Sequence, residues 1–263
     1  LKRNAPDLRV AATGSVRFWF NAWHDLAQLG GGSEQGVLNQ FVIPPQWEIA
    51  GGPSAEPSIL WLKCLGVDAV GVHQAPTQEI YRDVEHPNKF AGVLPVLWKS
   101  GEGDTLYRIP RRFPGIARVV DAARAASLRP FTSDDPIEPL RMYADWVENG
   151  PDSPAPSRWE GADALHVRAS VKAGQAILVQ ASYDPYWRAY SGGRRLPVRE
   201  DVMGLMLVEA PPGEHDLRLV FELPLENRIG RLVTVTTLAV VLGLMAAGLR
   251  SASPWALPGR PVA

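Results

Sequence analysis

The sequence predicts an α+β protein: a small α/β subdomain, then an antiparallel β-sandwich, then one transmembrane helix near the C-terminus. Three observations predict this class. Glycine and proline number 24 each among 263 residues, which favours short elements separated by many turns over a helical bundle. After residue 158 the hydrophobic pattern has a period of two, which is typical of strands with one buried face. Residues 232–249 carry no charged side chain, and such a run predicts a membrane span.

Composition narrows the classes of function. The formal net charge of −1 excludes the strong basic field of a nucleic-acid-binding protein, so we expect no nucleic-acid partner. Cys64 is the single cysteine, and no two of the five histidines are spaced as metal ligands. Because metal sites and disulfides need such groups, we expect no metal ion, no other cofactor and no disulfide within the chain.

Residues 1–148 are expected to form the α/β subdomain. A helix is expected at 57–65, with Gly66 just after its end and an apolar strand at 67–73, a unit that is typical of an α/β layer. Residues 14–40 are rich in aromatic side chains and glycine and are expected to form a long structured loop that leads into a helix. The remaining expected elements are strands at 8–13, 93–98, 105–109 and 116–120 and a helix at 136–148.

A linker and the β-sandwich are expected next. Residues 149–157 contain three prolines in nine positions, which predicts a linker. The sandwich is expected over 158–226, where Leu217 and Leu219 share one strand face and Arg218 lies on the other. Its strands are expected at 162–171, 176–183, 187–190, 195–198, 204–210 and 216–223.

The apolar run 232–249 is bracketed by Arg231 and Arg250. Its 18 residues would span about 27 Å as a helix, close to the ~30 Å hydrocarbon core of a bilayer. The alternative is a buried core helix. This alternative is disfavoured because the run is apolar on every face. Equal numbers of arginines flank the two ends, so the positive-inside rule does not orient the span. Residues 250–263 are expected to be a short tail.

Two stretches resemble the C-terminal extracytoplasmic domain of YfhO-like bacterial membrane proteins. The first resembles the family's Y-x-P-x-W-x-A-Y-x-G strand and turn and its following hairpin. The second, residues 60–73 with 107–120, resembles a strand and a Pro-Arg segment of the same family, although Ala69 replaces the usual aromatic residue and Ile109 the usual Asn. The residues that match the first pattern are Tyr183, Pro185, Trp187, Tyr190, Gly192, Pro212, Gly213, His215 and Leu217.

A further segment, residues 20–36, is similar to a loop in large bacterial membrane proteins related to pyruvoyl-tetrahydropterin synthase. The histidine cluster that binds metal in that enzyme has no counterpart here. The YfhO-like resemblance implies a multi-span protein of the GT-C glycosyltransferase type, which moves sugars from lipid-phosphate donors outside the cytoplasm.

The same resemblance implies that this chain is the non-catalytic C-terminal part of a longer protein, because the catalytic carboxylate of such proteins lies in an early loop between spans. We therefore expect a protein of the cell membrane, with one span in this chain and the bulk of the chain extracytoplasmic. The implied partners are membrane lipid, the upstream spans of the same protein, and a lipid-linked sugar or glycan.

Two groups of residues are candidates for substrate binding. A carboxylate beside an imidazole can perform acid–base chemistry or bind a cation, and clustered aromatic rings can stack on a sugar. Both groups could instead have a structural role. The first group would then form hydrogen bonds within a loop, and the second would pack in the sandwich. The first group comprises Trp23, His24, Asp25, Glu34 and Gln35, and the second comprises Tyr183, Tyr186 and Trp187.

Three functions remain open from the sequence. The chain could cap the membrane site of a GT-C-like transferase or hold its acceptor glycan. It could instead be a membrane-tethered carbohydrate-binding module. The third alternative is a self-contained hydrolase that uses His24 and Asp25. No catalytic residue is assigned, and whether the chain is an enzyme stays open.

Overall fold

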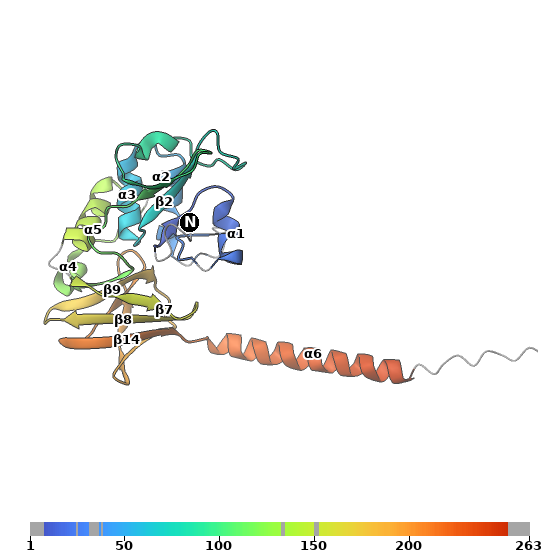
Figure 1. Cartoon of the computed structure of the whole chain (residues 1–263). Helices are drawn as coiled ribbons and strands as arrows, with labels where there is room; N and C mark the ends of the chain where they lie inside the picture. The colour runs from blue at the N-terminus through green and yellow to red at the C-terminus, as the bar shows by residue number, and fades with distance from the viewer. Residues whose placement is uncertain are drawn as a thin grey trace, which may run out of the picture. The chain divides into compact units, whose positions relative to one another are not determined.

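The computed structural model describes residues 8–24, 26–31, 37, 39–132, 135–149 and 153–251 (Figure 1). The chain divides into two units. The first, Leu1–Phe221, contains all the β-sheets found among the described residues, and the second, Glu222–Ala263, contains one long helix. The predicted fold class is confirmed, because helices combine with antiparallel sheets, two sheets form a sandwich, and an apolar helix follows.

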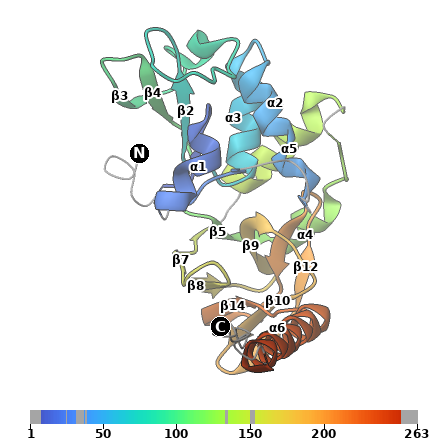
Figure 2. The ribbon, with the colours of Figure 1, turned by 90° about the vertical axis from the view of Figure 1, so that its right-hand side faces the viewer.

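A four-stranded mixed sheet lies in the N-terminal part of the first unit (Figure 2). Its strands are β1 (Val10–Ala11), β2 (Ala69–His73), β3 (Val96–Lys99) and β4 (Asp104–Arg108). The order is β1-β2-β4-β3, with β1 parallel to β2 and the other neighbours antiparallel. A parallel pair needs a crossover connection, and the crossover here contains the helices α1 (Val16–Trp23), α2 (Pro44–Ala50) and α3 (Ala55–Cys64) and the 3-10 turn η1 (Gln40–Val42). A second 3-10 turn, η2 (Pro87–Phe90), precedes β3.

The composition of residues 14–40 predicts a loop, but this segment contains the helix α1. The apolar residues Val16, Trp19, Phe20 and Trp23 recur at intervals of three and four, which is the spacing of one helix face. The expectation of a loop is wrong at these positions because richness in aromatic residues and glycine conceals this periodicity.

Gly66 ends α3 and allows close packing against the sandwich. Its φ is +72°, and the backbone N–H of Val67 donates to the carbonyl of Leu62 at 2.9 Å, the pattern of a Schellman cap. A Cβ at Gly66 would lie 2.9 Å from the side chain of Gln180. Glycine is therefore required here both by the backbone conformation and by the neighbouring strand.

The sandwich consists of two five-stranded antiparallel sheets, which we name the inner and the outer sheet. A shared core of apolar side chains, with members from both sheets, lies between them. The inner sheet contains, in spatial order, β12 (Val198–Glu200), β13 (Leu205–Val208), β9 (Gln175–Ser182), β5 (Ala117–Asp121) and β6 (Ser153–Pro154). The outer sheet contains β11 (Arg194–Leu196), β10 (Trp187–Ser191), β14 (Gly213–Phe221), β8 (Ala164–Val171) and β7 (Ser157–Trp159).

The inner sheet is buried on both faces. Ile177 of β9 faces the sandwich core, whereas the next residue, Leu178, belongs to the core that the sheet shares with the helices. The helical side of this second core includes α3 and α5 (Ile137–Asn149), and the short helix α4 (Ala122–Ser127) follows β5 directly. Burial on both faces explains why these strands are continuous apolar runs, while β14 of the outer sheet alternates.

The sandwich begins earlier in the sequence than residue 158. Strand β5, which precedes the proline-rich segment, pairs with β9 over Ala117–Asp121. Within the segment 149–157, β6 pairs with β5. The described residues of the first unit are therefore one packed body, in which the α/β part and the sandwich share the inner sheet.

A buried polar cluster holds this body together. Arg118 of β5 is 0% exposed, and its guanidinium donates to Glu148 Oε1 of α5 at 2.9 Å and to Gln180 Oε1 of β9 at 3.0 Å. Arg111 donates to the same Gln180 oxygen at 2.8 Å and pairs with Asp68 at 2.8 Å. Burial, and next the positive charge of Arg118, lower the pKa of Arg111 to about 10, so Arg111 remains charged at neutral pH.

The second unit is the helix α6 (Leu225–Ser251). Its part Leu225–Gly248 is long and apolar enough to cross a membrane, and none of its apolar window is buried. Within this chain, α6 is therefore not a buried core helix. The hydroxyls of Thr234 and Thr236 each donate to the carbonyl four residues earlier, at 2.8 Å. These polar groups are thus satisfied within the helix, as a hydrocarbon environment requires.

Replacement of Glu148 by Ala should destabilise the first unit strongly. The change leaves the guanidinium of Arg118 buried without its carboxylate, and loss of one partner of a buried pair typically costs about 3–5 kcal/mol. Chemical denaturation of the full chain in detergent, followed by tryptophan fluorescence, measures the loss. Glu138→Ala is the matched control on the same helix, since Glu138 pairs with Arg141 at the surface and such pairs contribute little. Equal midpoints for the two variants would contradict the structural role of Glu148.

Candidate functional site

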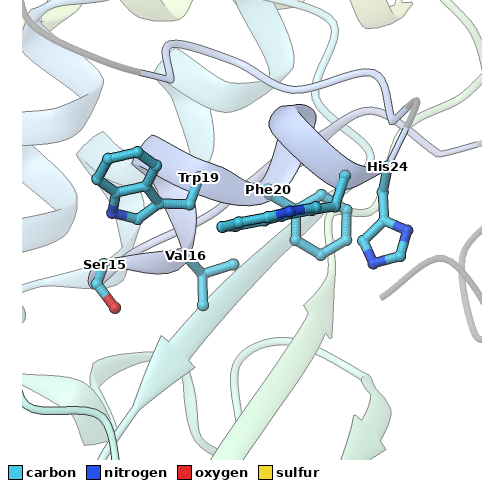
Figure 3. A pocket seen from close by; sticks show the side chains of 6 residues that line it. Ser15, Val16, Trp19, Phe20 and His24 are labelled. Atoms are coloured by element: carbon cyan, nitrogen blue, oxygen red, sulfur yellow. The ribbon is translucent and has the colours of Figure 1, made fainter.

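The first candidate group lies at a hollow beside α1. The hollow has a volume of about 530 Å³ and is lined by Ser15, Val16, Trp19, Phe20, Trp23 and His24. Figure 3 shows that the labelled side chains of Trp19, Phe20 and His24 come from the helix and its C-terminal end. Two of the predicted residues, Trp23 and His24, are therefore brought to one hollow.

His24 ends α1. Its backbone N–H donates to the carbonyl of Phe20 at 2.9 Å, and its ring lies 5.1 Å from the Phe20 ring. The rings of Trp19 and Trp23 are 6.3 Å apart. Asp25, Glu34 and Gln35 lie outside the described residues, so the predicted pairing of His24 with a carboxylate stays a prediction. The lining that is described is mainly apolar, which favours an apolar partner over a charged one.

The second candidate group lies at a hollow of about 400 Å³ on the sandwich. Tyr183 and Trp187 both line it, as the sequence predicts for a shared site, whereas Tyr186 is not among the lining residues. The ring of Tyr186 instead lies 6.4 Å from that of Phe221. The complete lining is Tyr183, Pro185, Trp187, Arg188, Arg195, Leu196, Pro197 and Val198.

A tight turn positions Trp187. Its backbone N–H donates to the carbonyl of Asp184 at 3.0 Å, and the carboxylate of Asp184 accepts from the backbone N–H of Tyr186 at 2.8 Å. The half-buried indole packs edge-on against Phe221 at 5.6 Å and against Trp159 at 6.2 Å. Trp187 is therefore both part of the sandwich packing and a wall of the hollow.

Two arginines give the sandwich hollow its charge. The guanidinium of Arg188 donates to the carbonyls of Pro185 and Trp187, which fixes its position. Arg195 is exposed, and no ion pair joins it to a described carboxylate. Among the described residues that line the hollow, none is acidic. Guanidinium groups beside aromatic rings suit a ligand with a sugar ring and a carboxylate or phosphate group.

The sequence does not single out Arg195 as a residue that lines the hollow. It predicts solvated loop charges at Arg194-Arg195, with contact to phosphate or anionic headgroups as the alternative, and nothing in the spacing separates one arginine from the other. Arg195 pairs with Tyr190 across β10 and β11, and only this pairing brings it beside the turn that carries Trp187. The alternation of side chains along a strand is the signal that could have separated the two arginines, since Arg194 and Arg195 point to opposite faces.

A third hollow, of about 200 Å³, contains His73 and Asp104. The imidazole Nδ1 lies 2.9 Å from Asp104 Oδ1, and its Nε2 lies 3.1 Å from the carbonyl of Thr13. The hydroxyl of Thr77 donates to the same Asp104 oxygen at 2.6 Å. Burial acts to raise the pKa of Asp104, but the hydrogen bonds from Thr77 and His73 outweigh it and lower the pKa.

The spacing of residues in the sequence does not predict this arrangement, because His73 and Asp104 come together only through the pairing of β2 with β4. Both imidazole nitrogens lie within hydrogen-bond distance of oxygen atoms of the protein. The network therefore ties the mixed sheet to the segment after β1, and it leaves no nitrogen open to a substrate. Among the residues that the structure describes, no three His, Cys, Asp or Glu side chains are grouped to hold a metal ion.

Comparison of the chain with protein-family models, with curated proteins and with solved structures finds no match. The resemblance to YfhO-like and GT-C proteins therefore stays a prediction from the sequence. The function is inferred below from the geometry of the hollows and from α6.

Truncation of Trp187 to Ala should destabilise the sandwich. A fully buried Trp or Phe costs about 3–5 kcal/mol on truncation, and we expect about 2–3 kcal/mol because Trp187 is only half-buried. Thermal and chemical unfolding of the full chain measure this change. Trp47→Ala is the control, because the side chain of Trp47 is 66% exposed and its truncation should change stability little. An unchanged unfolding midpoint for Trp187→Ala would mean that the ring serves as a free platform and not as part of the packing.

Proposed function

We propose that this chain is a membrane-anchored, non-catalytic module that holds an anionic glycan or sugar phosphate in the sandwich hollow. The observation that carries the proposal is the combination of two aromatic rings and two guanidiniums around one hollow of about 400 Å³. Aromatic faces stack on the apolar faces of sugar rings, and guanidiniums bind carboxylate or phosphate oxygens in a bidentate manner.

The anchor is α6. A helix of this length and apolarity would place the first unit beside a bilayer, because three residues, 222–224, separate the end of β14 from its start. Fully extended, three residues reach only about 10 Å. A ligand held in the sandwich hollow would then lie close to the membrane surface, where lipid-linked sugars are presented.

The larger protein implied by the YfhO-like resemblance extends this proposal. In that view the chain is the extracytoplasmic C-terminal part of a GT-C-like transferase, and the hollow holds the acceptor glycan or the sugar of a lipid-phosphate donor near a site formed by upstream spans. A membrane-tethered carbohydrate-binding module would use the same hollow in the same manner. Catalysis by this chain is not part of the proposal, since His73 is engaged and the carboxylate partner predicted for His24 lies outside the described residues.

The full chain should partition with membranes. Expressed material should sediment with the membrane fraction and require detergent for extraction, because the apolar window of α6 is not buried in the protein. Deletion of residues 225–263 should move the product to the supernatant. A full chain that is monomeric and soluble without detergent would contradict the proposed anchor.

Arg195→Ala should weaken binding of acidic sugars. We expect the full chain in detergent to bind a glucuronic-acid disaccharide more tightly than a neutral glucose disaccharide in calorimetric titrations. Loss of one charge-assisted contact at a partly exposed site should reduce affinity by about tenfold.

The matched control is Arg194→Ala, because Arg194 is the exposed neighbour that does not line the hollow. It should change affinity by less than about twofold. Equal affinity for acidic and neutral sugars, or equal loss in the two variants, would contradict the proposed site.

A further inference from the structure

Helix α1 exposes the side that a surface helix normally buries. Val16, Trp19, Phe20 and Trp23 form one stripe, and only Phe20 of it packs against a small core. Trp19 is 60% and Trp23 72% exposed. An amphipathic helix gains most of its stability in a protein by burying such a stripe, so the exposed Trp19 and Trp23 indicate a surface that meets an apolar partner.

The exposed stripe continues onto strand β3. Trp98 of β3 lines the third hollow together with Val16 and Phe20, and all four residues of β3 are exposed. We name this surface the aromatic face; its members are Trp19, Trp23 and Trp98.

The side chains of the aromatic face have the chemistry of a membrane interface. Tryptophan and tyrosine combine an apolar ring with a polar tip and are enriched where lipid headgroups meet the acyl chains. Helices that lie in this interface have Trp, Phe or Leu on one face and polar residues on the other. On α1, Arg17 lies on the side away from the stripe, where its guanidinium covers the rings of Phe18 and Tyr81 and pairs with Asp83 at 3.4 Å.

We propose that the aromatic face lies in the interfacial layer of the bilayer that α6 enters. This inference rests on the membrane anchorage proposed above. The short connection between β14 and α6 keeps the first unit within reach of the lipid, and the exposed tryptophan side chains supply the apolar surface that the interface takes up. The bilayer therefore covers Trp19 and Trp23, which the protein itself leaves exposed.

Site-specific labels in proteoliposomes test the proposal. Cys64 is buried, so a cysteine introduced at Trp19→Cys can be labelled selectively with an environment-sensitive fluorophore. The full chain is reconstituted in phosphatidylcholine vesicles with or without lipid that carries a shallow spin-label quencher. The label at position 19 should be quenched at least about twofold more than one at Met142→Cys, since only the former enters the interface. Met142 is the matched control, because it lies on α5 and is 60% exposed, as Trp19 is.

A third label, at Leu238→Cys, separates this inference from the anchorage on which it rests. Position 238 lies within the apolar window of α6 and should be quenched by deeply placed spin labels. Quenching at 238 with equal, weak quenching at 19 and 142 would overturn the aromatic face as a lipid-binding surface and leave the anchor standing. No quenching at either 19 or 238 would overturn both.

Two further results bear on other occupants. Shielding of the label at 19 from aqueous iodide that increases with protein concentration, without lipid quenching, would assign the face to a second copy of the chain and overturn the proposal. A label at Trp23→Cys that behaves as the one at 19 would support it, because Trp19 and Trp23 lie on the same helix face with rings 6.3 Å apart.

Discussion

The buried pairing of Arg118 with Glu148 is the constraint on which the first unit depends. Arg118 lies on the inner sheet and Glu148 on α5, and Gln180 of β9 accepts from Arg118 and Arg111. Because a buried charge without its partner is costly, the helices and the sandwich must pack together once either part forms. The central strands of the inner sheet consequently have two buried faces, and the mixed sheet contributes to the same core as the helices and the inner sheet.

This packing explains where the hollows lie. The central strands of the inner sheet are committed to cores, and the sandwich hollow lies where β10, β11 and β12 come together at the edge of the sandwich. At the outer sheet, the turn at Asp184 places Trp187 between the core and the solvent. At α1, Phe20 packs against a small core, whereas Trp19 and Trp23 of the same stripe stay exposed. The first surface has cationic and aromatic groups and suits a sugar acid, whereas the second is apolar and suits lipid.

The two proposed surfaces are consistent with one role at a membrane. A module that holds a charged sugar gains from being kept near the lipid that presents it, and an interfacial aromatic face would fix its orientation better than a single helix can. The proposals remain independent in their tests. Arg195 is remote from the aromatic face in sequence and element, so loss of glycan binding and loss of lipid contact are separately measurable.

The sequence by itself determined the α+β class, the apolar helix and most strands of the outer sheet, because local periodicity records which side of an element is buried. It also placed Tyr183 and Trp187 together, since one short turn joins them. It did not reveal α1, whose spacing was hidden by its composition, or the inclusion of β5 in the sandwich. Tertiary structure alone decided that Arg195 joins the hollow and that His73 meets Asp104. Such contacts depend on which strands pair over long separations, and periodicity does not specify what a buried side is packed against.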